Sequence, residues 1–138
     1  MREICFRLCE GFPKYEVGSD GSIWSLNYNH SGLRKQLRQY KDEDGYTYIF
    51  FVVNRKRYKR IIHRLVLCAF IPKPSPKHQC NHKNGIRHDN RLENLEWVTS
   101  RENTIDGWKR GRVFTNKQRK AASKNAKSLN KRRWSCVK

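Results

Sequence analysis

Positive charge is concentrated in two blocks of this 138-residue chain. Residues 31–77 contain 12 Lys or Arg and 3 Asp or Glu, and residues 107–138 contain 12 Lys or Arg and no acidic residue. The segment between them, residues 78–106, has a net charge of −1 and holds three of the five histidines. Because charged side chains are rarely buried without partners, the last block is restricted to a tail or a surface helix. We therefore expect one folded domain followed by a basic tail.

The total charge of +19 implies a polyanionic partner. Aromatic residues make up 12% of the chain, which argues against a wholly disordered basic protein, and 36% hydrophobic residues suffice for one modest core. No run approaches the roughly 18 apolar residues of a spanning helix, and the first residues lack the apolar region of a signal peptide. The cysteines form no CxxC pair, so reduced thiols are expected rather than a zinc site. Nucleic acid is the leading candidate for the partner, and a membrane or secreted protein is not expected.

Local patterns predict a β-rich first half. Residues 11–25 are typical of two short strands around a Ser-Asp-Gly turn. The aromatic and β-branched run 46–53 predicts a central strand, followed by a basic turn at 54–57. Apolar residues then recur at helical spacing over 61–70, before a spacer with alternating prolines.

The neutral segment predicts the order strand, loop, strand, helix. We expect a strand at 78–82, a Gly-containing loop at 83–90 and a partly extended return at 92–98. Residues 99–102 have the form of a capping box, so a helix should begin there and end near Gly111. Trp97 and Trp108, at the ends of the return strand and helix, are expected in the core, and His63 is expected to pack at the start of its helix.

Three segments carry a family resemblance. Cys80-Asn81-His82-Lys83-Asn84-Gly85 is followed by Asn-Arg-Leu-Glu-Asn-Leu-Glu-Trp-Val-Thr at 90–99 and by Glu-Asn at 102–103. This pattern resembles the HNH endonuclease family, and most of all its phage and intron-associated homing branch, whose third signature residue is Asn. Upstream, residues 11–25 resemble a short modular motif found ahead of such nucleases, and residues 63–72 resemble the helix that commonly precedes the nuclease motif. The resemblance therefore covers roughly residues 10 to 110.

The resemblance implies an α+β fold with a ββα-metal nuclease module and a role for each matching residue. His82 would be the general base and Asn94 the residue that orients it, while Asn81 and Asn103 would be metal ligands. An imidazole with a pKa near 6.5 can take a proton from water at neutral pH, and a hard divalent ion can neutralise charge that develops on phosphate oxygens. One Mg²⁺ or Mn²⁺ per active site is therefore implied, with double-stranded DNA as the substrate.

Asn81 stands where many members of the family have Asp. An amide oxygen can still bind Mg²⁺ but brings no negative charge, so metal affinity should depend more on the DNA phosphate.

Basic residues on either side of the neutral segment, and one within it, are candidates for contacts to backbone phosphates. They are Arg34, Lys35, Arg38, Arg55, Lys56, Arg57, Lys59 and Arg60 in the first part, Arg87 in the neutral segment, and Lys117, Arg119, Lys120, Lys124 and Lys127 in the tail. The division that follows is a DNA-binding β-rich segment with a helix at 1–76, the nuclease module at 77–111 and a basic DNA-binding tail at 112–138. For any run of charge a merely solvated face is the alternative, but the tail has no acidic residue, so phosphate contact is favoured there.

Two other functions stay open from the sequence: a DNA-binding regulator whose nuclease site has decayed, and an RNA-binding basic protein. Under the nuclease reading we expect a monomer without an obligate protein partner, which either nicks or cuts both strands. The resemblance also suggests a phage-encoded protein that acts in the cytoplasm of a bacterial host.

Overall fold

The computed structural model of the protein describes residues 2–111, so the predicted tail contacts from Lys117 to Lys127 lie outside the described residues. The fold is α+β, as predicted. By its contacts the chain divides into one unit of residues 1–103 and a second that begins at Thr104, and each is described by itself. The three-part division made from the sequence stays a prediction.

The first sheet is antiparallel, with the strand order β1-β2-β3-β4. Its strands are β1 (Phe6–Cys9), β2 (Phe12–Gly18), β3 (Ile23–Ser25) and β4 (Lys35–Gln36), with the short 3-10 helix η1 (Tyr28–His30) before β4. The hairpin predicted over 11–25 is confirmed as β2 and β3. Gly21 has a φ of +86° in its turn, a conformation that a residue with a Cβ rarely adopts.

The second sheet is also antiparallel, with β6 between β5 and β7. Its strands are β5 (Tyr40–Lys41), β6 (Thr47–Val53) and β7 (Lys56–Ile61). The central strand is therefore confirmed, but the basic turn at 54–57 is wrong in extent. Only Asn54 and Arg55 turn, with φ values of 50° and 62°, and Lys56 already pairs with Val53. Strand β7 forms hydrogen bonds to β6 with the backbone N–H and C=O groups that face it, so its charged side chains do not prevent strand formation.

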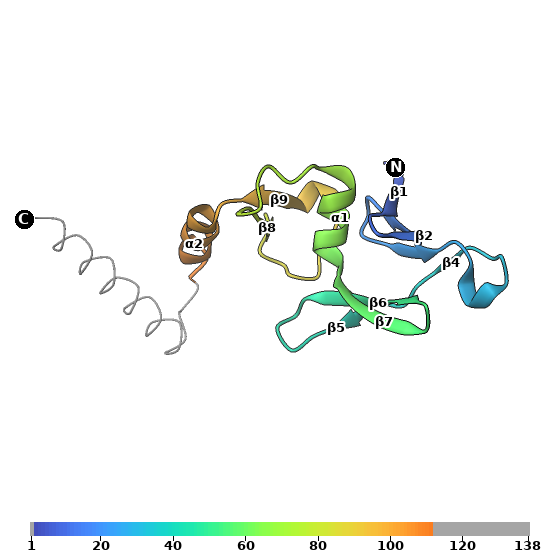
Figure 1. Ribbon diagram of the computed structural model, residues 1–138. Coiled ribbons are helices and arrows are strands. Elements are labelled where there is room, and N and C mark those ends of the chain that lie inside the picture. The colour runs from blue at the N-terminus through green and yellow to red at the C-terminus, as the bar shows by residue number, and fades with distance from the viewer. Residues whose placement is uncertain (1, 112–138) are drawn as a thin grey trace, which may run out of the picture. The chain divides into compact units, whose positions relative to one another are not determined.

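Helix α1 (Ile62–Phe70) lies at the centre of the first unit, as Figure 1 shows, and confirms the helix predicted from the apolar spacing. It packs against strands of all three sheets. Its residues Ile62, Val66 and Leu67 are fully buried in a single core that extends from Cys9 in β1 to Leu95 in the third sheet. Because this core is continuous, the N-terminal sheets and the last hairpin of the unit pack on the same helix.

That last hairpin consists of β8 (Gln79–His82) and β9 (Leu95–Val98), with the 3-10 helix η2 (Leu92–Asn94) before β9. Helix α2 (Ser100–Lys109) follows. The strand, loop, strand, helix order is thus confirmed, and so is the capping box: the Thr99 N–H donates to Glu102 Oε2 at 2.7 Å, and the Glu102 N–H donates to Thr99 Oγ1 at 3.3 Å.

The predicted stop is also confirmed, since Gly111 has a φ of +72° just after α2. The core position predicted for Trp108 is wrong, because 58% of its surface is exposed. Neither helix in residues 2–111 is long and apolar enough to cross a membrane.

Candidate active site

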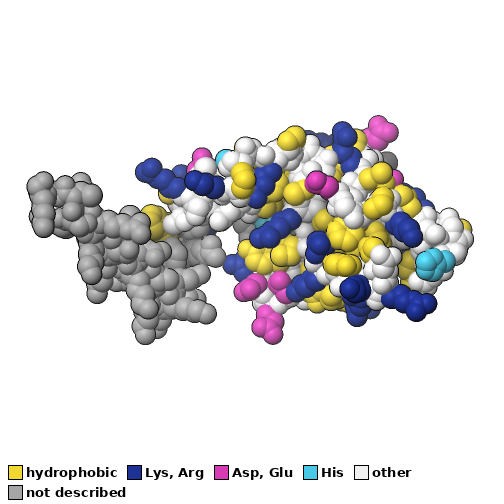
Figure 2. Space-filling view, in the orientation of Figure 1, with side chains coloured by type: hydrophobic (Ala, Val, Ile, Leu, Met, Phe, Trp, Pro, Cys, Tyr) yellow, Lys and Arg dark blue, Asp and Glu magenta, His cyan; other side chains and the backbone are white. Residues whose placement is uncertain are grey.

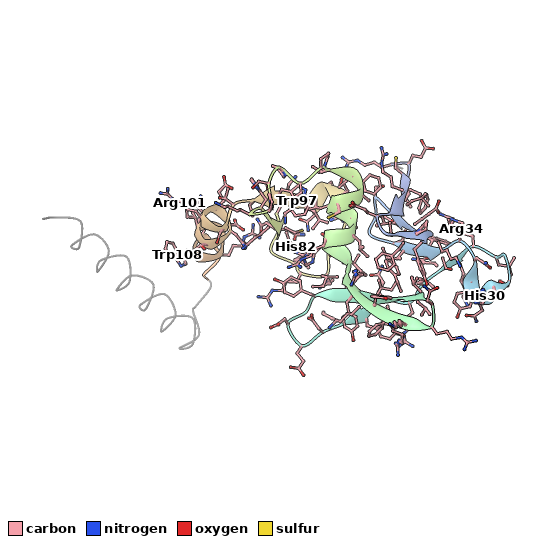
Figure 3. The ribbon with its side chains drawn as sticks, viewed as in Figure 1. His30, Arg34, His82, Trp97, Arg101 and Trp108 are labelled. Atoms are coloured by element: carbon pink, nitrogen blue, oxygen red, sulfur yellow. The ribbon has the colours of Figure 1, made fainter. Side chains whose placement is uncertain are left out.

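His82 is the last residue of β8 and lies where the hairpin meets helix α1 (Figure 3). It exposes only 6% of its surface, and its Nε2 lies 3.1 Å from Oδ1 of Asn90. A side-chain amide oxygen can only accept a hydrogen bond, so Nε2 carries the proton and donates it. Neutral His82 then has its basic lone pair on Nδ1. Burial lowers the pKa of His82, and the hydrogen bond to Asn90 partly opposes this shift, so the imidazole is neutral at pH 7 and able to accept a proton.

Two other rings enclose His82. The His63 ring, from the first turn of α1, packs edge-on with a centroid distance of 4.9 Å, and the Tyr46 ring lies 6.1 Å away. His63 is itself buried, which confirms the packing role predicted for it. Burial, with repulsion from His82 and Arg64, lowers the pKa of His63 to about 3. His63 is therefore also neutral, so His82 has no charged imidazolium beside it.

Asn94 holds together the loop between the two strands of the hairpin. Its Oδ1 accepts from the Asn84 N–H at 3.0 Å, and its Nδ2 donates to the Asp89 carbonyl at 2.8 Å. Hydrogen bonds from the Arg91 guanidinium hold the pKa of the Asp89 carboxyl well below its usual range. These bonds connect Asn84, near the start of the loop that follows His82, to Asn94 and Asp89 at its other end. The orienting role assigned to Asn94 stays a prediction, and such an effect can act through this loop.

Asn81 and Asn103, the two predicted metal ligands, come together at one face of the β8–β9 hairpin. Asn81 Nδ2 donates to Oε1 of Glu96, directly opposite in β9, at 3.0 Å. Asn103 Nδ2, on α2, donates to Gln79 Oε1 at 2.8 Å. Gln79 and Asn81 are two residues apart in β8 and so share a face. The structure thus brings both amides to that face, with the Glu96 carboxylate beside them.

This donor set fits a hard cation, because Mg²⁺ prefers oxygen ligands and usually keeps water or substrate phosphate in its coordination shell. Within residues 2–111, no three His, Cys, Asp or Glu side chains gather in a way that could hold a metal ion. A site here would therefore depend on amide oxygens, the neighbouring carboxylate and the phosphate of the substrate. The ligand roles of Asn81 and Asn103 stay predictions.

Among the described residues, all the predicted phosphate-binding side chains except Arg87 lie in or next to the strands of the N-terminal sheets. Basic and hydrophobic groups are interspersed on the surface shown in Figure 2. Successive side chains of a strand point to opposite faces, so the Lys and Arg side chains of β7 are divided between its two faces. Arg57 and Lys59 lie opposite Val52 and Phe50, on the face away from the core, whereas Lys56 and Arg60 lie on the other face. This division was not visible from the sequence because residues 56–57 were expected in a turn and no strand was predicted over 56–61.

Several of these cations are held against aromatic rings. The Arg57 guanidinium is 4.1 Å from the Phe50 ring centroid, and Lys59 Nζ is 3.9 Å from that of Tyr48. Arg34, labelled in Figure 3, forms an ion pair with Glu16 at 3.0 Å and lies over the Trp24 ring. The other predicted contacts in this part of the chain are Lys35, Arg38, Arg55 and Arg87, of which Arg87 donates to the Asp44 carbonyl at 2.6 Å. Their phosphate contacts stay predictions.

Sequence reasoning missed the two residues that complete this site. Asn90 bonds His82, the predicted base, and Glu96 bonds Asn81, a predicted metal ligand. The only signal for Glu96 was its place in the return strand, where the pairing of β8 with β9 sets it opposite Asn81. Asn90 lies in an irregular loop eight residues after His82, so no periodicity could place it next to the ring.

Comparisons with known proteins bear on the family and the fold of the chain. The sequence profile of the HNH endonuclease family matches residues 60–105, which include α1, the hairpin and the start of α2. Residues 60–105 are thus shown to be an HNH endonuclease segment. Two uncharacterised HNH endonucleases of Acanthamoeba polyphaga mimivirus are 37% and 32% identical to it, over 68% and 77% of the chain but only 23% and 31% of their own lengths.

The DNA endonuclease I-HmuI of Bacillus phage SP01 is 30% identical over 83% of the chain and 64% of that protein. A solved structure, described as DNA binding and cleavage by the HNH homing endonuclease I-HmuI, is similar in fold, with a TM-score of 0.71 and 28% identity. The match covers 86% of the present chain and 66% of the solved chain. The chain thus spans less than two thirds of the length of each of these relatives.

Proposed function

We propose that this protein is a divalent-metal-dependent endonuclease that hydrolyses phosphodiester bonds of double-stranded DNA. The observation that carries the proposal is the buried, neutral His82, held by a hydrogen bond at Nε2 at the end of a hairpin that matches the HNH endonuclease family. Such an imidazole has the properties of a general base, since it is unprotonated at neutral pH and fixed in orientation.

In this mechanism, Nδ1 of His82 removes a proton from water as the water attacks phosphorus. The bond from phosphorus to one bridging oxygen breaks, and the leaving oxygen takes a proton from solvent water. Asn94 keeps the base in place by fixing the loop that follows it. Asn81 and Asn103 would hold one Mg²⁺ or Mn²⁺ through their amide oxygens, next to Glu96. A bound divalent cation would stabilise the negative charge that develops on the phosphate oxygens.

DNA binding is assigned mainly to the basic parts of the chain on either side of this site. Residues 31–77 and 107–138 together account for more than the whole net charge, whereas residues 78–106 carry −1. Phosphate contacts supply sequence-independent affinity. We therefore propose that residues 1–76 and 112–138 bind the duplex and that residues 77–111 cut it.

One active site per chain cuts one strand in each binding event, so a monomer should nick DNA. The relatives described above come from an amoebal virus and a bacteriophage. A phage-encoded enzyme that acts in the cytoplasm of a bacterial host is consistent with the second of these and stays a proposal.

The test is incubation of the purified protein with supercoiled plasmid and Mg²⁺. Conversion to nicked or linear DNA, abolished by EDTA and by His82→Ala, supports the proposal. If the protein binds the plasmid but does not cut it with Mg²⁺ or Mn²⁺, the proposed activity is wrong and a DNA-binding regulator is favoured. A clear preference for structured RNA over duplex DNA in competition would contradict the proposed substrate.

A further inference from the structure

We infer that Asn90 is the positioning residue of the general base, and that Thr47 of the N-terminal part holds Asn90 in place. This inference rests on the proposed function of His82. It assigns a role in catalysis to strand β6, which the sequence linked only to the core. It also separates the roles of two loop asparagines, Asn90 and Asn94.

The first step is the contact between Asn90 and the base. Asn90 is 95% buried, and its Oδ1 accepts from Nε2 of His82 at 3.1 Å. A neutral imidazole has one protonated and one unprotonated nitrogen, and the partner of one nitrogen decides the state of the other. An amide oxygen at Nε2 therefore selects the tautomer in which Nδ1 is the basic atom.

The second step is the orientation of the Asn90 amide. An amide can turn over and present its NH2 group to the ring, which would select the opposite tautomer. In the structure, Nδ2 of Asn90 instead donates to Oγ1 of Thr47, the first residue of β6. Thr47 lies 43 residues earlier in the chain, so the state of the base depends on a contact between the N-terminal part and the nuclease hairpin.

The third step is the support of the Asn90 backbone by the turn between β2 and β3. A Cβ atom at Gly21 would lie 3.0 Å from both Cβ and the carbonyl oxygen of Asn90, so the two segments are in close contact. Beside it, the Leu92 N–H donates to the Ser19 carbonyl at 2.8 Å. The turn thus limits movement of the loop away from β6.

Asn94 differs from Asn90 in what its amide contacts. Both asparagines are buried, but the Asn94 amide bonds Asn84 and the Asp89 backbone, within the loop. Asn94 therefore acts on the shape of the loop, whereas Asn90 acts on the imidazole itself. Substitution of Asn90, more than that of Asn94, should change the protonation pattern of the ring.

The test compares wild type with Asn90→Ala, Asn90→Asp and Thr47→Val. Two-bond ¹⁵N–¹H spectra of the protein without DNA or metal show which ring nitrogen of His82 carries the proton, with His82→Gln to assign the signal. Cleavage at saturating DNA and the DNA dissociation constant are measured in parallel. Asn27→Ala is the matched control, because Asn27 makes a side-chain bond to the Gly32 N–H at 2.7 Å in the first part of the chain.

The expected wild-type result is a proton on Nε2. Asn90→Ala should give a mixture of tautomers and slow cleavage roughly 10–100-fold at an unchanged dissociation constant, the size of effect typical of residues that orient a functional histidine. Asn90→Asp, which keeps an acceptor for Nε2, should restore the tautomer, and Thr47→Val should shift it in part. Asn27→Ala should match wild type.

A proton on Nδ1 in wild type would overturn the inference, and so would an unchanged tautomer and rate in Asn90→Ala. If Asn90→Ala does not fold, Thr47→Val replaces it in the test, since valine has nearly the shape of threonine. An unchanged tautomer and cleavage rate in Thr47→Val would then overturn the inference. The spectra need neither DNA nor metal. A protein that keeps the Nε2 tautomer through Asn90 but does not cut DNA would therefore refute the proposed function and leave the structural assignment standing.

Discussion

Acidification should destabilise this fold through His63. The side chain exposes 7% of its surface, and within the described residues its Nδ1 has no hydrogen-bond partner. Burial, and then repulsion from His82 and Arg64, lowers its pKa to about 3, while Asp42 opposes the shift. The folded protein therefore keeps His63 neutral at pH values where the unfolded chain is already protonated.

The sign and size of the effect follow from this difference in proton binding. In the unfolded chain His63 is protonated below about pH 6.5, whereas in the folded chain it is protonated only below about pH 3. The free energy of unfolding therefore falls as the pH falls from about 6.5 to about 3. From about pH 8 to about pH 5, this linkage removes about 2 kcal/mol from the free energy of unfolding. His82, whose pKa burial also lowers, adds a loss of the same sign.

Urea denaturation followed by tryptophan fluorescence at both pH values measures this loss in wild type and in His63→Phe, which keeps an aromatic ring at the buried site. The variant should lose about 2 kcal/mol less than wild type between the two pH values. His30→Asn, which removes a histidine from the surface, should retain the wild-type loss. If His63→Phe loses as much stability as wild type, the buried neutral histidine is not the cause.

Three further predictions concern metal and DNA. Asn81→Asp should bind Mg²⁺ more tightly in calorimetry without DNA, because it adds a negative charge next to a hard cation; equal or weaker binding would show that residue 81 is not a ligand. Replacement of both Arg57 and Lys59 by Ala should weaken duplex binding and reduce the logarithmic salt slope by up to about 1.8, and an unchanged slope would remove this face of β7 from the DNA interface. Deletion of residues 112–138 should weaken binding and flatten its salt dependence while cleavage at saturating DNA persists, and loss of that cleavage would contradict the proposed division of binding and chemistry.

Locally encoded elements of the fold could be predicted from the sequence. The run 46–53 is rich in aromatic and β-branched residues, and the Ser-Asp-Gly turn and the 99–102 capping box are each specified by a few adjacent side chains. Strand β7 could not be predicted in the same way, because its sequence Lys-Arg-Tyr-Lys-Arg-Ile has no apolar alternation. Its structure comes from pairing with β6, a tertiary contact that overrides local preference.

The same limit applies to the site. The spacing of His82, Asn94 and Asn103 resembled a known family, and the family profile then matched the segment that contains them. The contact of Asn90 with Thr47 spans 43 residues and depends on how two separate elements pack. No pattern within a short window contains that information. Family resemblance therefore indicated the chemistry, and the packing of the fold indicated how the base is held.

The most direct test of the account compares DNA cleavage and DNA binding in wild type and His82→Ala, with Mg²⁺ at saturating duplex under single-turnover conditions. The account predicts that the cleavage rate falls by about 10²–10⁴-fold, the usual contribution of a general base, while the dissociation constant for DNA stays the same. Cleavage by His82→Ala at the wild-type rate would contradict the assignment of His82 as the general base.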